Sequence, residues 1–242
     1  MAKKKLDETS KSEVQEELAN VLADTLNKKF KETNFKIAYF LDKDEDSPSH
    51  VTEYISTGND ILDLAISNRP DGGLPVGRII EIMGESASGK SLLTATMLAN
   101  CQKKGGLAVY IDTENAVSSE FFTMLGLDIS KMIYSPVETI EDAFSVAETI
   151  IEKVRSSDKS KVVCIAIDSI MGASTKVEME ADYDKDGYAT SKAIILSKAM
   201  RKITNMIGRE RICLVLTNQL RDKVGAFGFG EKTQTSGGLV AA

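Results

Sequence analysis

Short apolar runs alternate along most of the chain with longer stretches in which apolar residues recur at helical spacing. The runs span residues 79–83, 107–112, 132–135, 162–168 and 212–217. Helical stretches over Lys90–Lys103, Thr139–Arg155 and Thr190–Ile207 lie between several of them. Strands that are apolar on both faces and alternate with helices indicate a parallel sheet covered by helices on both sides. The pattern therefore predicts an α/β fold.

The first 50 residues follow a different pattern. Apolar residues fall near one face of a helix predicted over Ser12–Lys31, and Lys36–Leu41 is a candidate for a short strand. Residues 42–49 are acidic and contain a proline, which is typical of a linker. We therefore divide the chain into a helix-and-strand arm over 1–50 and a main domain over 51–242. The arm is too small to bury its own apolar stripe, so we expect it to dock on this core or on a neighbouring copy.

The composition argues against a membrane protein and against a secreted, disulfide-rich one. Apolar residues make up 42% of the 242 residues, but no apolar run approaches the roughly 18 residues of a membrane span. The basic N-terminus lacks the apolar stretch of a signal peptide. Cys101, Cys164 and Cys213 show no metal-binding spacing, so we expect buried, reduced thiols and a cytoplasmic protein, in the host cytoplasm if the chain is viral.

Charge is distributed unevenly along the chain. The whole chain carries a net charge of −6, whereas residues 189–242 contain nine Lys or Arg against three acidic residues, a net charge of +6. This asymmetry indicates one surface that faces a polyanion. A solvated helix face would explain it equally well.

A glycine-rich motif lies between the first predicted strand of the main domain and the helix that follows it. The motif reads Gly84, Glu85, Ser86, Ala87, Ser88, Gly89, Lys90 and Ser91, which fits G-x-x-x-x-G-K-[ST]. The glycines let backbone N–H groups surround a phosphate, Lys90 reaches the terminal phosphates, and the Ser91 hydroxyl binds Mg²⁺. Because a strand precedes the motif and a helix follows it, we expect these residues to bind a nucleotide together with Mg²⁺.

Polar side chains stand at the ends of three other predicted strands. Asp168 ends one of them and is a candidate for holding the Mg²⁺ shell beside the motif. Asp112 and Glu114 stand near the end of another, where a carboxylate can position or deprotonate the attacking water. Spacing alone does not choose between these two acids. Gln219 follows the last strand, where its amide either bonds the terminal phosphate or bonds nearby backbone.

Taken together, five segments resemble one family. They are residues 55–94, 110–128, 164–180, 197–203 and 216–238. In this order they resemble the RecA family of DNA strand-exchange proteins, most of all its bacterial members and their bacteriophage relatives of the UvsX type. The resemblance implies a RecA-like P-loop NTPase core with a mostly parallel sheet. It also implies that the N-terminal helix and strand are a polymerisation arm that docks on the adjacent subunit.

The resemblance assigns roles to individual residues. It implies that Lys90, Glu114 and Gln219 are catalytic, with Glu114 as the catalytic glutamate and Gln219 coupling the γ-phosphate to DNA binding. Phe121 matches an aromatic residue that stacks near the adenine. The implied DNA-binding loops are residues 178–188 and 220–236. The implied DNA contacts are Arg201, Arg221, Lys223, Val224, Gly225, Gly237 and Gly238, with Val224 as an apolar wedge between base triplets.

As a whole, the resemblance implies a DNA-dependent ATPase for homologous recombination and DNA repair. The expected cofactors are ATP and Mg²⁺. The expected partners are single-stranded DNA, double-stranded DNA and further copies of the chain in a helical filament, without a membrane.

Two departures from the family pattern qualify this expectation. Ser118 stands where the family usually has an acid beside the adenine. The chain stops at Ala242, where family members continue, so we expect a C-terminally truncated protein. The alternative function is a catalytically incomplete fragment that binds nucleotide and filaments. A RecA-fold helicase or clock-like regulator is disfavoured by Val224 and the glycine-rich loop around it.

Overall fold

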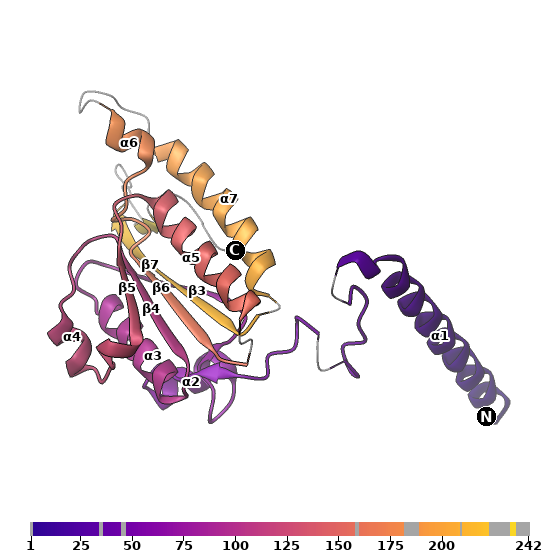
Figure 1. Cartoon of the computed structure of the whole chain (residues 1–242). Coiled ribbons are helices and arrows are strands. Elements are labelled where there is room, and N and C mark those ends of the chain that lie inside the picture. The colour runs from indigo at the N-terminus through magenta and orange to yellow at the C-terminus, as the bar shows by residue number, and fades with distance from the viewer. Residues whose placement is uncertain are drawn as a thin grey trace, which may run out of the picture. The chain divides into compact units, whose positions relative to one another are not determined.

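The computed structural model describes residues 2–33, 36–44, 47–157, 160–181, 189–208, 210–222 and 233–235. The chain divides into two compact units, Met1–His50 and Val51–Ala242, which Figure 1 draws in one view. The first unit consists mainly of helix α1 (Ala2–Lys29), which begins before the predicted start at Ser12, and a 3-10 turn, η1, at Lys31–Thr33.

Helix α1 presents apolar side chains to solvent. These are Val14, Leu18, Val21, Leu22 and Leu26, which are between 42% and 64% exposed. An ion pair of 2.5 Å between Lys43 and Glu16 fastens the segment after the helix back onto it. The apolar stripe lies on the helix as predicted, and an exposed stripe of this kind is typical of a surface that binds another element.

The strand predicted at Lys36–Leu41 is not formed, and this part of the prediction is wrong for the structure. The N–H groups of Ile37 and Ala38 donate to Oδ1 of Asn27 at 2.8 and 2.9 Å, and the N–H of Phe40 donates to a carboxylate oxygen of Asp44 at 2.6 Å. A strand is assigned only when its backbone pairs with another strand. Here side chains take those backbone donors instead.

The second unit is built on a parallel sheet. Its strands lie in the order β3 (Ile79–Gly84), β7 (Ile212–Asp222), β6 (Val163–Asp168), β4 (Leu107–Asp112) and β5 (Met132–Pro136), and every neighbouring pair is parallel. A short strand, β8 (Thr233–Thr235), adds antiparallel to the outer part of β7. The predicted α/β class, with a mostly parallel sheet, is confirmed.

Helices cover both faces of the sheet, as Figure 1 shows. On one face, α5 (Ile140–Ser156) and α7 (Ala189–Ile207) bury a core that includes Phe144, Leu196 and Ile165. On the other, α3 (Lys90–Lys103) and α4 (Ser119–Met124) bury a second core that includes Leu98 and Phe122. Parallel strands need both faces covered, which is why their sequences are apolar throughout.

Smaller elements complete the second unit. Two short strands, β1 (Tyr54–Ile55) and β2 (Leu74–Pro75), pair antiparallel around helix α2 (Asp60–Ser67), and helix α6 (Lys176–Glu180) follows strand β6. A 3-10 turn, η2 (Ile129–Lys131), leads into β5. All three cysteines are buried and free, as predicted.

The carboxyl ends of the parallel strands meet at one edge of the sheet. Gly84 ends β3, Asp168 ends β6, Asp112 ends β4, and Gln219 pairs with Gly84 in the β3–β7 register. Ligands of open α/β sheets bind outside these carboxyl ends. The fold therefore brings the polar residues that were singled out in the sequence to a single edge.

Candidate nucleotide site

The glycine-rich motif forms a tight loop between β3 and α3. Ala87 and Gly89 have left-handed backbone conformations, with φ of 59° and 88°. A Cβ added at Gly84 would lie 2.5 Å from Oγ of Ser88, so the loop folds back closely on the end of β3. Gly89 caps α3 without a side-chain hydrogen bond, so the first-turn N–H groups of α3 are not bonded by its cap residue. Such a loop at a helix N-terminus is a concave surface for an anion.

A cavity of about 300 Å³ opens beside this loop. Its lining residues are Ser86, Ala87, Ser88, Gly89, Lys90, Ser91, Leu92, Glu114, Phe121, Asp168, Ser169 and Gln219. Gly84 and Glu85 do not line it, but their carbonyl oxygens accept hydrogen bonds of 3.2 and 2.7 Å from Nζ of Lys90. The structure thus brings the predicted catalytic and nucleotide-binding residues to one place, from five separate segments of the chain.

Asp168 is held at the end of β6 by two hydroxyl groups. The Tyr110 hydroxyl, from β4, donates to Oδ2, and the Thr217 hydroxyl, from β7, donates to Oδ1 at 2.5 Å. Burial, followed by the charge of Asp168, raises the pKa of Tyr110 far above its usual range, so the phenol keeps its proton. Sequence reasoning missed both donors. The available signal was a hydroxyl at two otherwise apolar strand positions next to the strand that ends in Asp168.

Ser91 and Asp168 line the same cavity and offer a hydroxyl and a carboxylate oxygen. Oxygen donors of these kinds are the protein ligands that Mg²⁺ accepts, usually together with substrate phosphates and water. The residues present therefore fit a magnesium site.

The structure separates the two acids that spacing could not. Asp112 is 2% exposed and accepts hydrogen bonds from the N–H groups of Glu114 and Asn115 at 3.0 and 2.8 Å and from the Tyr134 hydroxyl at 2.9 Å. Glu114 lines the cavity instead. Asp112 shapes the turn after β4, and this turn carries Glu114 to the cavity.

Glu114 is fixed by the loop that follows β6. The Ser169 hydroxyl donates to Oε1 of Glu114 at 2.5 Å and accepts a hydrogen bond of 3.0 Å from the N–H of Gly172. A Cβ at Gly172 would lie 2.4 Å from Cγ of Glu114, so only glycine fits there without displacement. Nζ of Lys192, in the first turn of α7, donates to the carbonyls of Met171 and Ala173 at 3.0 and 2.5 Å. Sequence reasoning missed all of these supports.

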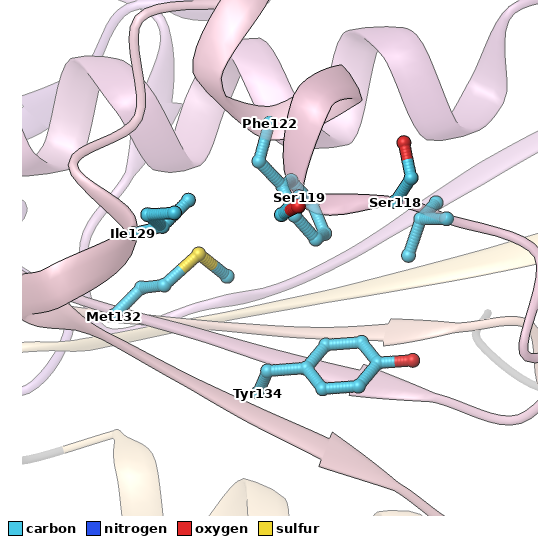
Figure 2. A pocket seen from close by; sticks show the side chains of 7 residues that line it. Ser118, Ser119, Phe122, Ile129, Met132 and Tyr134 are labelled. Atoms are coloured by element: carbon cyan, nitrogen blue, oxygen red, sulfur yellow. The ribbon is translucent and has the colours of Figure 1, made fainter.

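A second cavity of about 280 Å³ is lined by residues of α4 and of the edge strand β5. Figure 2 shows Met132 and Tyr134 of β5 across from Ser118, Ser119 and Phe122 at the start of α4. Val117 and Ile129 complete the lining. Phe121 lines the first cavity and Phe122 the second, with their ring centroids 5.7 Å apart. Helix α4 therefore contributes a phenylalanine to each cavity.

The predicted DNA contacts are only partly covered by the structure. Arg201 is exposed on α7, and the backbone of Arg221 belongs to β7. The other predicted contacts, which are Lys223, Val224, Gly225, Gly237 and Gly238, lie outside the described residues. In the described part of the first predicted DNA loop, residues 178–180 form the end of helix α6.

The fold and the first cavity define a class of protein: an open parallel α/β protein whose glycine-rich loop joins a sheet strand to a buried helix. A family model described as the RecA N-terminal domain matches residues 16–241, so the chain belongs to the RecA family. Among the residues that the structure describes, no helix is long and apolar enough to cross a membrane.

Individual relatives support the same assignment. The chain is 38% identical to Protein RecA of Chlamydia abortus over 192 residues, which is 79% of this chain and 52% of the relative. It is 37% identical to Protein RecA of Leifsonia xyli over 198 residues, or 82% of this chain and 52% of the relative. For Protein RecA of Bifidobacterium longum, the identity is 37% over 80% of this chain and 46% of the relative. The chain spans about half the length of the curated relatives it matches.

Proposed function

We propose that this chain is the ATPase core of a DNA strand-exchange protein that acts in homologous recombination and repair. In this proposal it binds ATP with Mg²⁺ in the first cavity, assembles as a filament on single-stranded DNA, and exchanges that strand with a homologous duplex. The observation that carries the proposal is the convergence of Lys90, Ser91, Glu114, Asp168 and Gln219 on one cavity, in a chain of the RecA family.

The loop, Lys90, Ser91, Asp168 and Glu114 have distinct tasks in ATP hydrolysis. The loop N–H groups and Lys90 bind the phosphates, and Ser91 and Asp168 hold the cation. Bound Mg²⁺ neutralises charge that develops on the terminal phosphates. Glu114 orients the attacking water and accepts its proton, because it is the one of the two acids after β4 that lines the cavity, and Ser169 fixes it there.

Gln219 is proposed to connect the nucleotide with DNA. Its side chain lines the cavity, and the chain runs on from it, through the rest of β7, into the second predicted DNA loop at residues 220–236. A hydrogen bond from the Gln219 amide to the terminal phosphate would fix the start of that segment. The net positive charge of residues 189–242 supports DNA as the polyanion.

Self-association is proposed to use the arm of one copy and the sheet edge of the next. The arm carries the exposed stripe on α1, with Leu18 at 58% and Leu22 at 54% exposed. In the described part of the sheet, β5 is an edge strand, and Ile133 on it is 41% exposed. An edge strand with an exposed apolar side chain is suited to receive a segment of another chain.

ATP hydrolysis by the chain, measured with and without single-stranded DNA, tests the proposal. We expect hydrolysis that DNA stimulates, and we expect Lys90→Ala to abolish it together with ATP-dependent DNA binding. Lys103→Ala, an exposed position at the other end of the same helix, is the matched control and should change neither. Nucleotide and filament binding without DNA-stimulated hydrolysis would instead support a catalytically incomplete fragment. ATP-dependent DNA binding that survives Lys90→Ala contradicts the proposal.

A further inference from the structure

Two hydroxyl groups approach Asp168 from the strands on either side of it. Strand β6 lies between β7 and β4 in the sheet. Tyr110 on β4 donates to one carboxylate oxygen of Asp168, and Thr217 on β7 donates to the other at 2.5 Å. Both donors are fully buried, at 0% exposure. Each oxygen of the carboxylate therefore has its own donor, and the two donors come from different strands.

The hydroxyl of Tyr110 lies in buried, apolar surroundings, where an apolar side chain would need no hydrogen-bond partner. Its neighbours Val109 and Ile111 are 0% exposed, and its ring packs edge-on against Phe122, with centroids 4.9 Å apart. A buried hydroxyl without a partner is costly, so the hydrogen bond to Asp168 is needed to keep it there. Tyr110 is thus bonded directly to one of the two residues that fit Mg²⁺.

The two hydrogen bonds restrict how Asp168 can turn. A carboxylate has about four lone-pair directions, and one on each oxygen is taken by a hydroxyl donor. The directions that remain are fixed by the rigid strands, since β4 and β7 pair with β6 along its length. Groups that hydrogen-bond to a ligating side chain orient it and tune its affinity for the metal.

We propose that Tyr110 and Thr217 are positioning residues that present the Asp168 carboxylate to a divalent cation. The hydroxyl pair thereby sets the Mg²⁺ concentration at which the chain binds nucleotide tightly. This proposal rests on the proposed function, because it requires that the first cavity binds ATP with Mg²⁺. Neither residue touches the nucleotide in this view, since neither lines the cavity.

The test uses the whole chain and a fluorescent ATP analogue, with Mg²⁺ titrated from a chelated start. Removal of a supporting hydrogen-bond partner typically costs about 10- to 100-fold in metal affinity. We therefore expect Tyr110→Phe and Thr217→Val each to raise the half-saturating Mg²⁺ concentration by about 10-fold. Affinity for the analogue at saturating Mg²⁺ should change little. A purely structural role would lower thermal stability without moving the Mg²⁺ curve.

Tyr134→Phe is the matched control. It removes a tyrosine hydroxyl that donates to a strand-end carboxylate, that of Asp112 at 2.9 Å, but Asp112 does not line the first cavity. The control should leave the Mg²⁺ curve in place. Because Tyr110→Phe and Thr217→Val alter different strands, either variant that folds provides the test.

The outcomes separate this proposal from the proposed function. If the unaltered chain binds the analogue and the variants show the same half-saturating Mg²⁺ concentration, the positioning role is refuted and the proposed function stands. If the Tyr134→Phe curve moves as far as the others, the role is likewise refuted. If the unaltered chain binds no analogue at any Mg²⁺ concentration, both proposals fail.

Discussion

Replacing Gly172 by alanine tests whether Glu114 is the residue that activates water. The added Cβ would lie 2.4 Å from Cγ of Glu114, 3.1 Å from its Cδ and 3.0 Å from Oε1. Carbon atoms in contact are about 3.5–4.0 Å apart, so the Glu114 side chain must move by about 1 Å. A misplacement of about 1 Å at a catalytic group can cost roughly 100-fold in rate. We therefore expect ATP hydrolysis to fall about 100-fold.

Binding of ATP should be spared, because the three atoms nearest to the added methyl group all belong to Glu114 and none to the glycine-rich loop. Single-turnover hydrolysis and equilibrium binding of the nucleotide measure the two effects separately. Gly208→Ala is the control, since a Cβ there meets only the carbonyl oxygen of Thr204 at 3.4 Å. Full hydrolysis by a folded Gly172→Ala variant would refute the role assigned to Glu114.

Three further tests address the two acids after β4, the hydrogen bonds of Lys192 and the exposed stripe of α1. Glu114→Gln should lower ATP hydrolysis by about 100-fold or more and leave ATP binding intact. Asp112→Asn should instead lower the free energy of unfolding, measured in urea, by about 1–3 kcal/mol. The reverse pattern would contradict the roles assigned to these two acids. Lys192→Met removes the donor to two carbonyl groups and should lower the free energy of unfolding by about 1–3 kcal/mol. Equal urea midpoints for the variant and the unaltered chain would refute this. Leu22→Glu on α1 should abolish self-assembly of the chain, measured by sedimentation. Asn20→Glu, on the opposite side of the helix, is the control and should leave self-assembly unchanged. Self-assembly by both variants would contradict the role of the arm.

The sheet could be predicted from the sequence because its central strands β4, β6 and β7 are buried on both faces. That burial leaves an uninterrupted apolar run, and all five runs became strands. Residues 36–41 carry a similar short pattern but no strand. Pairing needs a partner, and the side chains of Asn27 and Asp44 bind the backbone there. A run of apolar residues therefore predicts a strand only where the fold supplies a neighbour.

The sequence predicts those residues of the cavity that belong to a motif or to the end of a predicted strand. Lys90 and Ser91 follow from the spacing of the glycine-rich motif, and Asp168 follows from its place at a strand end. Tyr110 and Thr217 could not be found in this way. Their partner is 58 and 49 residues away in the chain, and only the strand order β7–β6–β4 brings them together.

The two acids after β4 show why sequence spacing left a real ambiguity. Asp112 and Glu114 are both carboxylates near one strand end, and a strand alternates its faces every residue, so positions two apart start in the same direction. The turn after Asp112 breaks that alternation: its carboxylate bonds the N–H groups of Glu114 and Asn115, and Asn115 takes a left-handed φ of 51°. Asp112 is thereby buried as the turn's hydrogen-bond acceptor, and Glu114 is turned to the cavity, where Ser169 fixes it. The first acid thus positions the second, and loss of either should affect the chain through a different observable.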